Sequence, residues 1–134
     1  MNVEIITTPY FERDAKKLIK KYRSLKGELE QLIDELEADP RAGIHIKENV
    51  YKIRLAVKSK GKGKSGGMRV ITFVDVALIE IEETTDVYLL SIYDKSEREN
   101  IPDARLSALV EEIQAEVDKM KWALGIDSDK EEES

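Results

Sequence analysis

The sequence contains no cysteine, three prolines, one histidine and only 6% aromatic residues. The absence of cysteine excludes disulfides, thiolate nucleophiles and cysteine-ligated metal sites, and it fits a reducing compartment. No apolar run approaches the roughly 18 residues that a membrane-spanning helix needs. Residues 1–17 also lack the apolar core of a signal peptide. We therefore expect a cytoplasmic protein with no membrane partner.

What the sequence does contain is typical of one folded domain with a charged surface. Its 134 residues are 41% hydrophobic and 37% charged. Residues 1–125 carry the apolar patterning of a folded domain. Residues 126–134 are mostly acidic and polar, and they predict a disordered tail. This tail could aid solubility or weaken RNA binding, and we favour solubility.

The positive charge is concentrated in the middle of the chain. Residues 41–73 hold nine Lys and Arg against one acid, Glu48, a local charge of +8. The total charge is −6, so the remaining residues carry −14. Because a local patch sets the field that a polyanion meets, the acidic total does not argue against a nucleic-acid partner.

Two helices and a first strand are predicted before this basic segment. Residues 3–6 are a short apolar strand, and Thr8-Pro9 is typical of a helix start with an N-cap followed by proline. A second helix begins near Ser24 and must end before Pro40. Both helices have apolar residues at helical spacing, which predicts a helical hairpin.

Strands and a last helix follow. The period changes to two in residues 51–57, and residues 69–74, prolonged by 76–81, form the next strand. Residues 83–86 are the expected turn before a buried strand at 87–93, and a final helix runs from about Pro102 to Gly125. The order β-α-α-β-β-β-α predicts an α+β domain with a small, twisted, mostly antiparallel sheet.

The loop at 58–67 alternates lysine with glycine and serine. Glycines allow a phosphate chain to come close, and lysines neutralise it. Gly63-Lys64-Ser65 looks like the end of a P-loop, but Lys58 stands where that motif needs glycine, and a strand follows where it needs a helix. We reject the P-loop interpretation. A plain solvated connection is the alternative, since surface charge runs often have no function.

Three residues on the flanking strands favour function. Arg54 precedes the loop and Arg69 follows it, so both guanidiniums would lie at its base if the two strands pair. Arginine suits bidentate phosphate contacts and stabilises charge in a phosphoryl transition state. Tyr93, which would project near the same sheet edge as Lys95, could stack on a base or transfer a proton. The alternative for Tyr93 is a half-buried strand aromatic.

These motifs together resemble the RelE/HigB toxin family. The matching pieces are K-I-R, a lysine/glycine loop ending in Gly-Gly, x-R-V-I, and L-L-x-I-Y-x-K-x-E, with F-x-R-x-x-K-K-L upstream. They cover about residues 8–115. The resemblance implies a RelE-like fold, with a helical hairpin and a C-terminal helix on the sheet. It also implies cleavage of mRNA in the ribosomal A site without metal or cofactor, and a cognate antitoxin that blocks the site.

Carried onto this chain, the resemblance gives two groups of site residues. The expected catalytic residues are Arg54, Arg69, Tyr93, Lys95 and Lys64. The expected RNA-binding residues are Lys52, Lys58, Lys60 and Lys62. A ribose 2′-hydroxyl would attack the adjacent phosphate, with the arginines holding the phosphate and a lysine or Tyr93 transferring protons. Which lysine does so stays open.

Other interpretations remain at this point. A ParE-like toxin shares the scaffold but inhibits DNA gyrase through a protein interface, and a binding module would contact RNA or the ribosome without cutting it. His45, the only histidine, lies before the strand and outside the matching motifs, so we give it little weight as a base. Glutamates show no metal-ligand spacing. The segment 76–86 is longer than in compact relatives, which extends the expected sheet outward.

Overall fold

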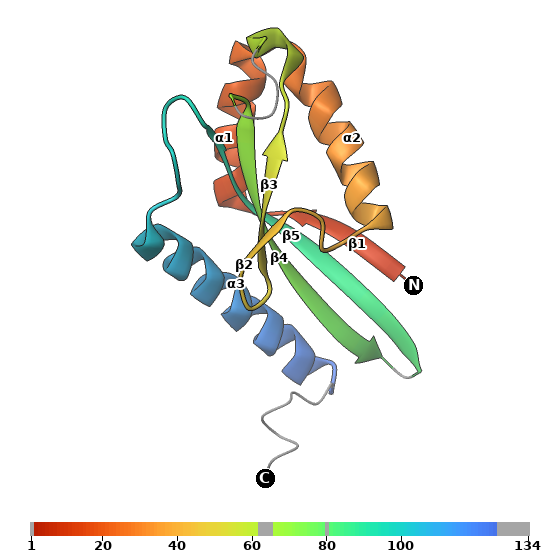
Figure 1. The fold of residues 1–134 in the computed structure, drawn as a ribbon. Helices are drawn as coiled ribbons and strands as arrows, with labels where there is room; N and C mark the ends of the chain where they lie inside the picture. The colour runs from red at the N-terminus through yellow and green to blue at the C-terminus, as the bar shows by residue number, and fades with distance from the viewer. Residues whose placement is uncertain (1, 62–65, 80, 126–134) are drawn as a thin grey trace.

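The computed structural model describes residues 2–61, 66–79 and 81–125. Its strands form a single sheet, and its helices pack on the faces of that sheet (Figure 1). In chain order they are β1 (Asn2–Thr7), α1 (Pro9–Lys21), α2 (Leu25–Ala38), β2 (Ile44–Lys47), β3 (Val50–Leu55), the 3-10 turn η1 (Lys58–Lys60), β4 (Met68–Ile79), β5 (Glu82–Asp94) and α3 (Asp103–Ala123). The predicted acidic tail, 126–134, lies outside the described residues.

The sheet has five strands in the order β1-β5-β4-β3-β2. β1 pairs with β5 in parallel, and the other neighbours are antiparallel. The predicted α+β class with a mostly antiparallel sheet is therefore confirmed. Sequence reasoning missed β2, because this edge strand is only four residues long and all four are exposed. Such a segment carries no burial signal that alternation could reveal.

The helical hairpin forms as predicted. The Thr8 side chain accepts a hydrogen bond from the Phe11 amide at 3.3 Å, and Pro9 occupies the first helical position. α2 ends at Ala38, before Pro40. Phe11 and Ala15 of α1 pack with the leucines of α2 against one face of the sheet. We call this the hairpin face.

The opposite face of the sheet carries a second core and α3. Ile71, Phe73 and Leu90 of the sheet pack there with Leu106 and Leu109 of α3. We call this the α3 face. Alternation along the strands sorts side chains between the two cores, so residues that pair directly across neighbouring strands share a face. This sorting decides which of the predicted site residues can meet.

The β4–β5 hairpin differs from the prediction. Residues 83–86 are not the turn but part of β5, paired with residues 75–78 of β4. The two strands stay paired as far as Ile79 and Glu82, so their connection comes earlier in the chain than predicted. The expected turn instead contains Thr84 and Thr85, which are β-branched and fit a strand; Thr85 is buried. The sheet does extend outward, with strands of 12 and 13 residues.

The two ends of the molecule are therefore different. At one end, the α1–α2 turn, η1 and the segment after β5 come together, while the β4–β5 hairpin projects the other way (Figure 1). The first of these ends holds the predicted site.

No helix in the described ranges is long and apolar enough to cross a membrane.

Candidate functional site

Arg54, Arg69 and Tyr93 form one row across three strands. Arg54 of β3 pairs with Arg69 of β4, and Arg69 pairs with Tyr93 of β5. Directly paired residues point to the same face, with their Cβ atoms about 5 Å apart. The row lies on the α3 face, where Tyr93 packs in the second core. The predicted meeting of both arginines with Tyr93 is thus present in the fold.

The two arginines differ in exposure. Arg54 is exposed, whereas Arg69 is only 4% exposed and donates a hydrogen bond to the Met68 carbonyl at 3.1 Å. Arg54 can contact an anion from solvent, and a phosphate matches the fork of its guanidinium. An anion would therefore reach this row from the side of Arg54.

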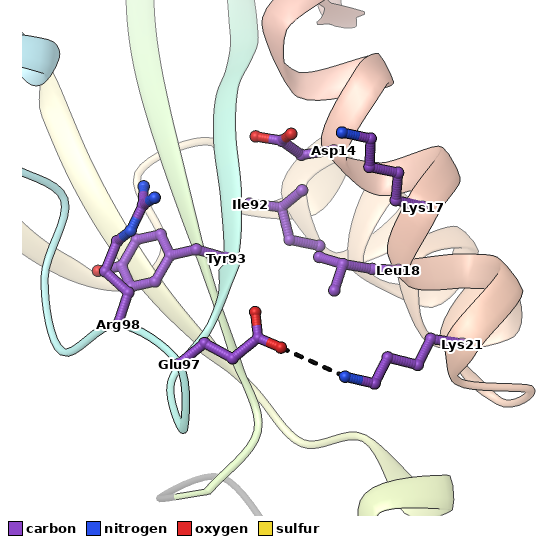
Figure 2. Close-up of a pocket in the computed structure, with 8 residues that line it drawn as sticks. All are labelled: Asp14, Lys17, Leu18, Lys21, Ile92, Tyr93, Glu97 and Arg98. Carbon is purple, nitrogen blue, oxygen red and sulfur yellow. Dashed lines mark hydrogen bonds and ion pairs between the residues drawn. The ribbon is translucent and has the colours of Figure 1, made fainter.

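Tyr93 is more buried than either prediction for it, a residue that contacts RNA or a half-buried strand aromatic. The residue is 6% exposed, and its hydroxyl makes no hydrogen bond within normal geometric limits to any described residue. Burial raises the pKa of Tyr93, an effect that the Ile101 backbone, Arg69 and Arg98 partly offset. The phenol therefore stays protonated at neutral pH. Arg98 lies beside its ring (Figure 2), and because Tyr93 is buried, a nucleobase can stack on it only if neighbouring residues move.

A pocket of about 410 Å³ lies next to Tyr93, between α1 and the end of β5. Figure 2 shows Lys17 and Lys21 from α1 facing Glu97 and Arg98 across it. The pocket contains charges of both signs, and Lys21 pairs with Glu97 at 3.3 Å. Because its charges partly cancel, it is a weaker anion site than the arginine pair.

Two further predicted residues flank the row. Lys52 lies two residues before Arg54, on the same face of β3, and donates to the Asn100 side chain at 3.2 Å. The Lys95 amide donates to the Gly67 carbonyl at 3.0 Å, which ties the end of β5 to the end of the basic loop. The Lys95 ammonium lies 3.5 Å from the exposed Glu99 carboxylate, a contact that contributes little in water.

The loop lysines do not stay together. Lys58 is exposed on the side of the helical hairpin. Lys60 turns inward and forms an ion pair with Asp94, in which the two side chains are 6% and 0% exposed. In this position Lys60 does not present its charge to solvent, which differs from the role expected of it in binding RNA. Lys62 and Lys64 lie outside the described residues.

Asp94 is the centre of a polar network that sequence reasoning missed. Besides Lys60, its carboxylate accepts hydrogen bonds from the Tyr22 hydroxyl at 2.9 Å and from the amide and hydroxyl of Ser96 at 2.9 and 2.7 Å. Burial alone would raise its pKa, but these donors outweigh burial, and the pKa of Asp94 lies well below its usual range. The signal in the sequence that could have revealed this network is an acidic residue at the end of a buried strand.

The base of the loop is also fixed to the helical hairpin. The Lys58 amide donates to the Glu28 carboxylate at 2.8 Å, and the Ser59 amide donates to the Ser24 hydroxyl at 3.0 Å. Together with the Lys60–Asp94 pair, these contacts hold η1 in place on the side of the sheet opposite the arginine row. The loop therefore starts on one face and leads to β4, which carries Arg69 on the other.

His45 lies apart from this row. It is on the edge strand β2, opposite Tyr51, with the two rings 5.1 Å apart, and Tyr51 packs toward the hairpin face. The position agrees with the low weight given to it as a base. The ranges that the structure describes contain no cluster of three or more His, Asp or Glu side chains placed to hold a metal ion.

Comparison with known proteins supports the fold. No protein-family model matches the sequence. Among solved structures, the fold is similar to that of an arginine-to-alanine double mutant of the E. coli toxin RelE in the free state. The TM-score is 0.50 and the sequence identity 17%, with 84% of this chain and 99% of that chain covered. The chain therefore has the RelE-like fold that its motifs predict.

Proposed function

We propose that this protein is the toxin of a type II toxin–antitoxin system and cleaves mRNA on the ribosome. The observation that carries the proposal is the Arg54–Arg69 pair, two arginines that are direct partners on neighbouring strands at the base of a lysine loop. Arginine suits bidentate contact with phosphate, so the pair marks a place where a phosphate chain can be held. The RelE-like fold is consistent with this function but does not establish it.

The chemistry follows from what a basic site can stabilise. A ribose 2′-hydroxyl gives its proton to a base, here a neutral lysine of the loop, and attacks the adjacent phosphorus. The phosphorane gains negative charge, and the bond from phosphorus to the 5′-oxygen breaks as that oxygen takes up a proton, which leaves a cyclic phosphate. Arg54 and Arg69 would hold the phosphate and stabilise the added charge, as cations do in other phosphoryl transfers. Lys52 and Lys95 flank the row on either side and would contact the neighbouring phosphates.

Proton transfer is assigned to the same region. Tyr93 stays protonated because its pKa is raised, so it would act as a donor to the leaving oxygen once the Arg98 segment uncovers it. We assign Lys64 of the loop to proton exchange and Lys62 of the loop to RNA binding. The antitoxin would act by covering the arginine row, and the chain would work in the cytoplasm, where its substrate is.

Primer-extension mapping of one mRNA in a bacterial translation extract tests the proposal. The purified protein is added with ribosomes translating and with initiation blocked. We expect breaks at fixed positions within codons only during translation, and the 3′ fragments should begin with a free 5′-hydroxyl. Intact mRNA in both reactions contradicts cleavage. If DNA gyrase supercoiling is then inhibited, the protein is a gyrase-directed toxin. If the intact protein instead sediments with ribosomes, it is a binding module.

A further inference from the structure

A second cationic surface lies outside the arginine row, at the turn between α1 and α2. It is an open groove of about 1050 Å³, and the charged groups that line it are all positive. They come from the end of α1, the turn, the start of α2 and η1, and they are Lys20, Lys21, Arg23, Lys26 and Lys58. We call this the helix-turn groove.

Most of these charges point to solvent without a partner. Lys20, Arg23 and Lys26 are exposed, and none forms an ion pair with another described residue. Lys21 pairs with Glu97 at 3.3 Å, but both side chains are more than half exposed, so the pair is weak. The groove therefore presents a net positive field.

Glu28 of α2 offsets part of this field, and its carboxylate also helps to build the groove. One oxygen of the Glu28 carboxylate accepts from the Lys58 amide at 2.8 Å and the other from the Ser24 hydroxyl at 3.0 Å. These bonds draw η1 onto the helical hairpin. They thereby place the Lys58 side chain beside the α1–α2 turn, so the groove is assembled by the same contacts that fix the loop.

We infer that the helix-turn groove binds the phosphate backbone of RNA that continues from the arginine row. The inference rests on the proposed function. Lys58 follows Arg54 by four residues, a chain length that spans at most about 14 Å. Arg54 lies on the α3 face and Lys58 beside the helical hairpin, so an RNA strand that contacts both would have to pass around the end of the sheet that carries η1. Backbone contacts of this kind position a substrate without reading its bases.

The composition of the groove favours RNA over an acidic protein. Among the described residues that line it, four of the five cations are lysines, Ile19 is the one large apolar residue, and none is aromatic. Protein interfaces are depleted in lysine and enriched in aromatic residues at their centres. Phosphate tracks, in contrast, need clustered cations and little apolar surface.

Binding to RNA measured at several salt concentrations tests the inference. The test variant is Lys20→Gln with Arg23→Gln and Lys26→Gln, all exposed positions, so the fold should be unaffected. The matched control removes the same charge far from the groove, by Arg41→Gln, Lys47→Gln and Lys119→Gln, which are also exposed. The probes are an oligouridylate of about 12 nucleotides, an RNA hairpin and a polyglutamate peptide.

We expect the test variant to bind oligouridylate about tenfold more weakly at low salt, with a slope of log affinity against log salt shallower by about 2. The control should retain the wild-type slope. Equal losses in test and control variants would contradict the inference, since net charge alone would then explain them. A larger loss for polyglutamate than for either RNA would overturn it in favour of an acidic protein partner.

The two RNA probes separate the possible sources of the phosphates. A loss confined to oligouridylate assigns the groove to single-stranded mRNA, and a loss confined to the hairpin assigns it to a ribosomal RNA helix. The proposed function fails separately from the groove. If wild-type protein does not cut translated mRNA but the test variant still loses RNA affinity, the groove binds RNA and the cleavage proposal is wrong.

Discussion

The two ends of β5 place the same residue types in opposite electrostatic surroundings. At the end next to the loop, donors from Lys60, Ser96 and Tyr22 hold the pKa of Asp94 below its usual range. Eight residues away, toward the connection between β4 and β5, burial and the charges of Glu4 and Asp75 raise the pKa of Asp86. The strand itself is continuous, so the difference comes from what packs against each end.

The tyrosines of β5 show the same contrast. Burial and the nearby acids raise the pKa of Tyr88 to about 12. Burial also raises the pKa of Tyr93, but Arg69 and Arg98 oppose the effect there. The charges around Tyr93 therefore favour a negative group and those around Tyr88 disfavour it, although burial raises the pKa of both tyrosines. A polyanion such as RNA is favoured at the end with the arginine row, and this gradient can be tested.

The largest expected effect is the loss of the exposed arginine of the row. Arg54→Ala should lower mRNA cleavage in translation extracts about 100-fold, because one charge-stabilising donor at a phosphoryl transition state is lost. Arg41→Ala, on another exposed arginine, should leave cleavage unchanged. The readout is the rate at which primer-extension breaks appear. Wild-type cleavage by a folded Arg54→Ala protein would remove Arg54 from the site.

The next largest expected effect is a loss of stability when Asp94 is replaced by a neutral residue. Asp94→Asn leaves the buried Lys60 ammonium without its counter-charge, so we expect the free energy of unfolding to fall by about 3 kcal/mol at pH 7 in urea titrations. Adding Lys60→Gln should recover part of this loss, since the remaining amides can hydrogen-bond. A double variant as unstable as the sum of the single ones contradicts the pairing.

The pH dependence of this loss has a defined sign. The folded-state pKa of Asp94 is lowered, so its contribution to stability is present above the unfolded value of about 4 and is lost as pH falls toward the folded value. The gap in unfolding free energy between wild type and Asp94→Asn should therefore narrow below about pH 4. A constant gap between pH 7 and pH 3 would mean that shape, not charge, causes the loss.

Tyr93 should have a smaller effect on cleavage. If its hydroxyl donates a proton, Tyr93→Phe lowers cleavage about tenfold. Because its pKa is raised, the wild-type rate should show no titration of this group between pH 7 and 8.5. Tyr88→Phe is the matched control in the middle of β5, away from the arginine row, and should cleave normally. Equal rates for wild type and Tyr93→Phe would leave Tyr93 as a core residue only.

The smallest effect is expected at Asp86. Its pKa is raised in the folded state, so the folded protein favours the protonated form, and that stability is lost as pH rises through the folded value. Asp86→Asn should then be more stable than wild type by at most about 0.5 kcal/mol at pH 7, because water screens a partly exposed group. At pH 3 the two should unfold alike. If Asp86→Asn is clearly less stable than wild type at pH 7, the electrostatic contrast between the two ends of β5 is contradicted.

Local patterns in the sequence were enough to predict most of the fold. Thr8-Pro9 sets the start of α1 because an N-cap hydroxyl and a preset φ act within one turn. The alternation in β3 separates Ile53, in the hairpin core, from Arg54. The β4–β5 turn was misplaced because Glu83 and Asp86 suit turns, although Thr85 between them is buried in the sheet.

The sequence by itself determined the basic loop, the two arginines beside it and the acidic C-terminal tail, because these follow from residue type and short-range spacing. Only the tertiary structure decided which cations face solvent. Lys58 and Lys60 are two residues apart, yet one lines the helix-turn groove and the other is buried against Asp94. Asp94, Tyr22 and Ser24 are brought to the loop by strand pairing and helix packing, contacts between residues far apart in sequence that no local pattern contains.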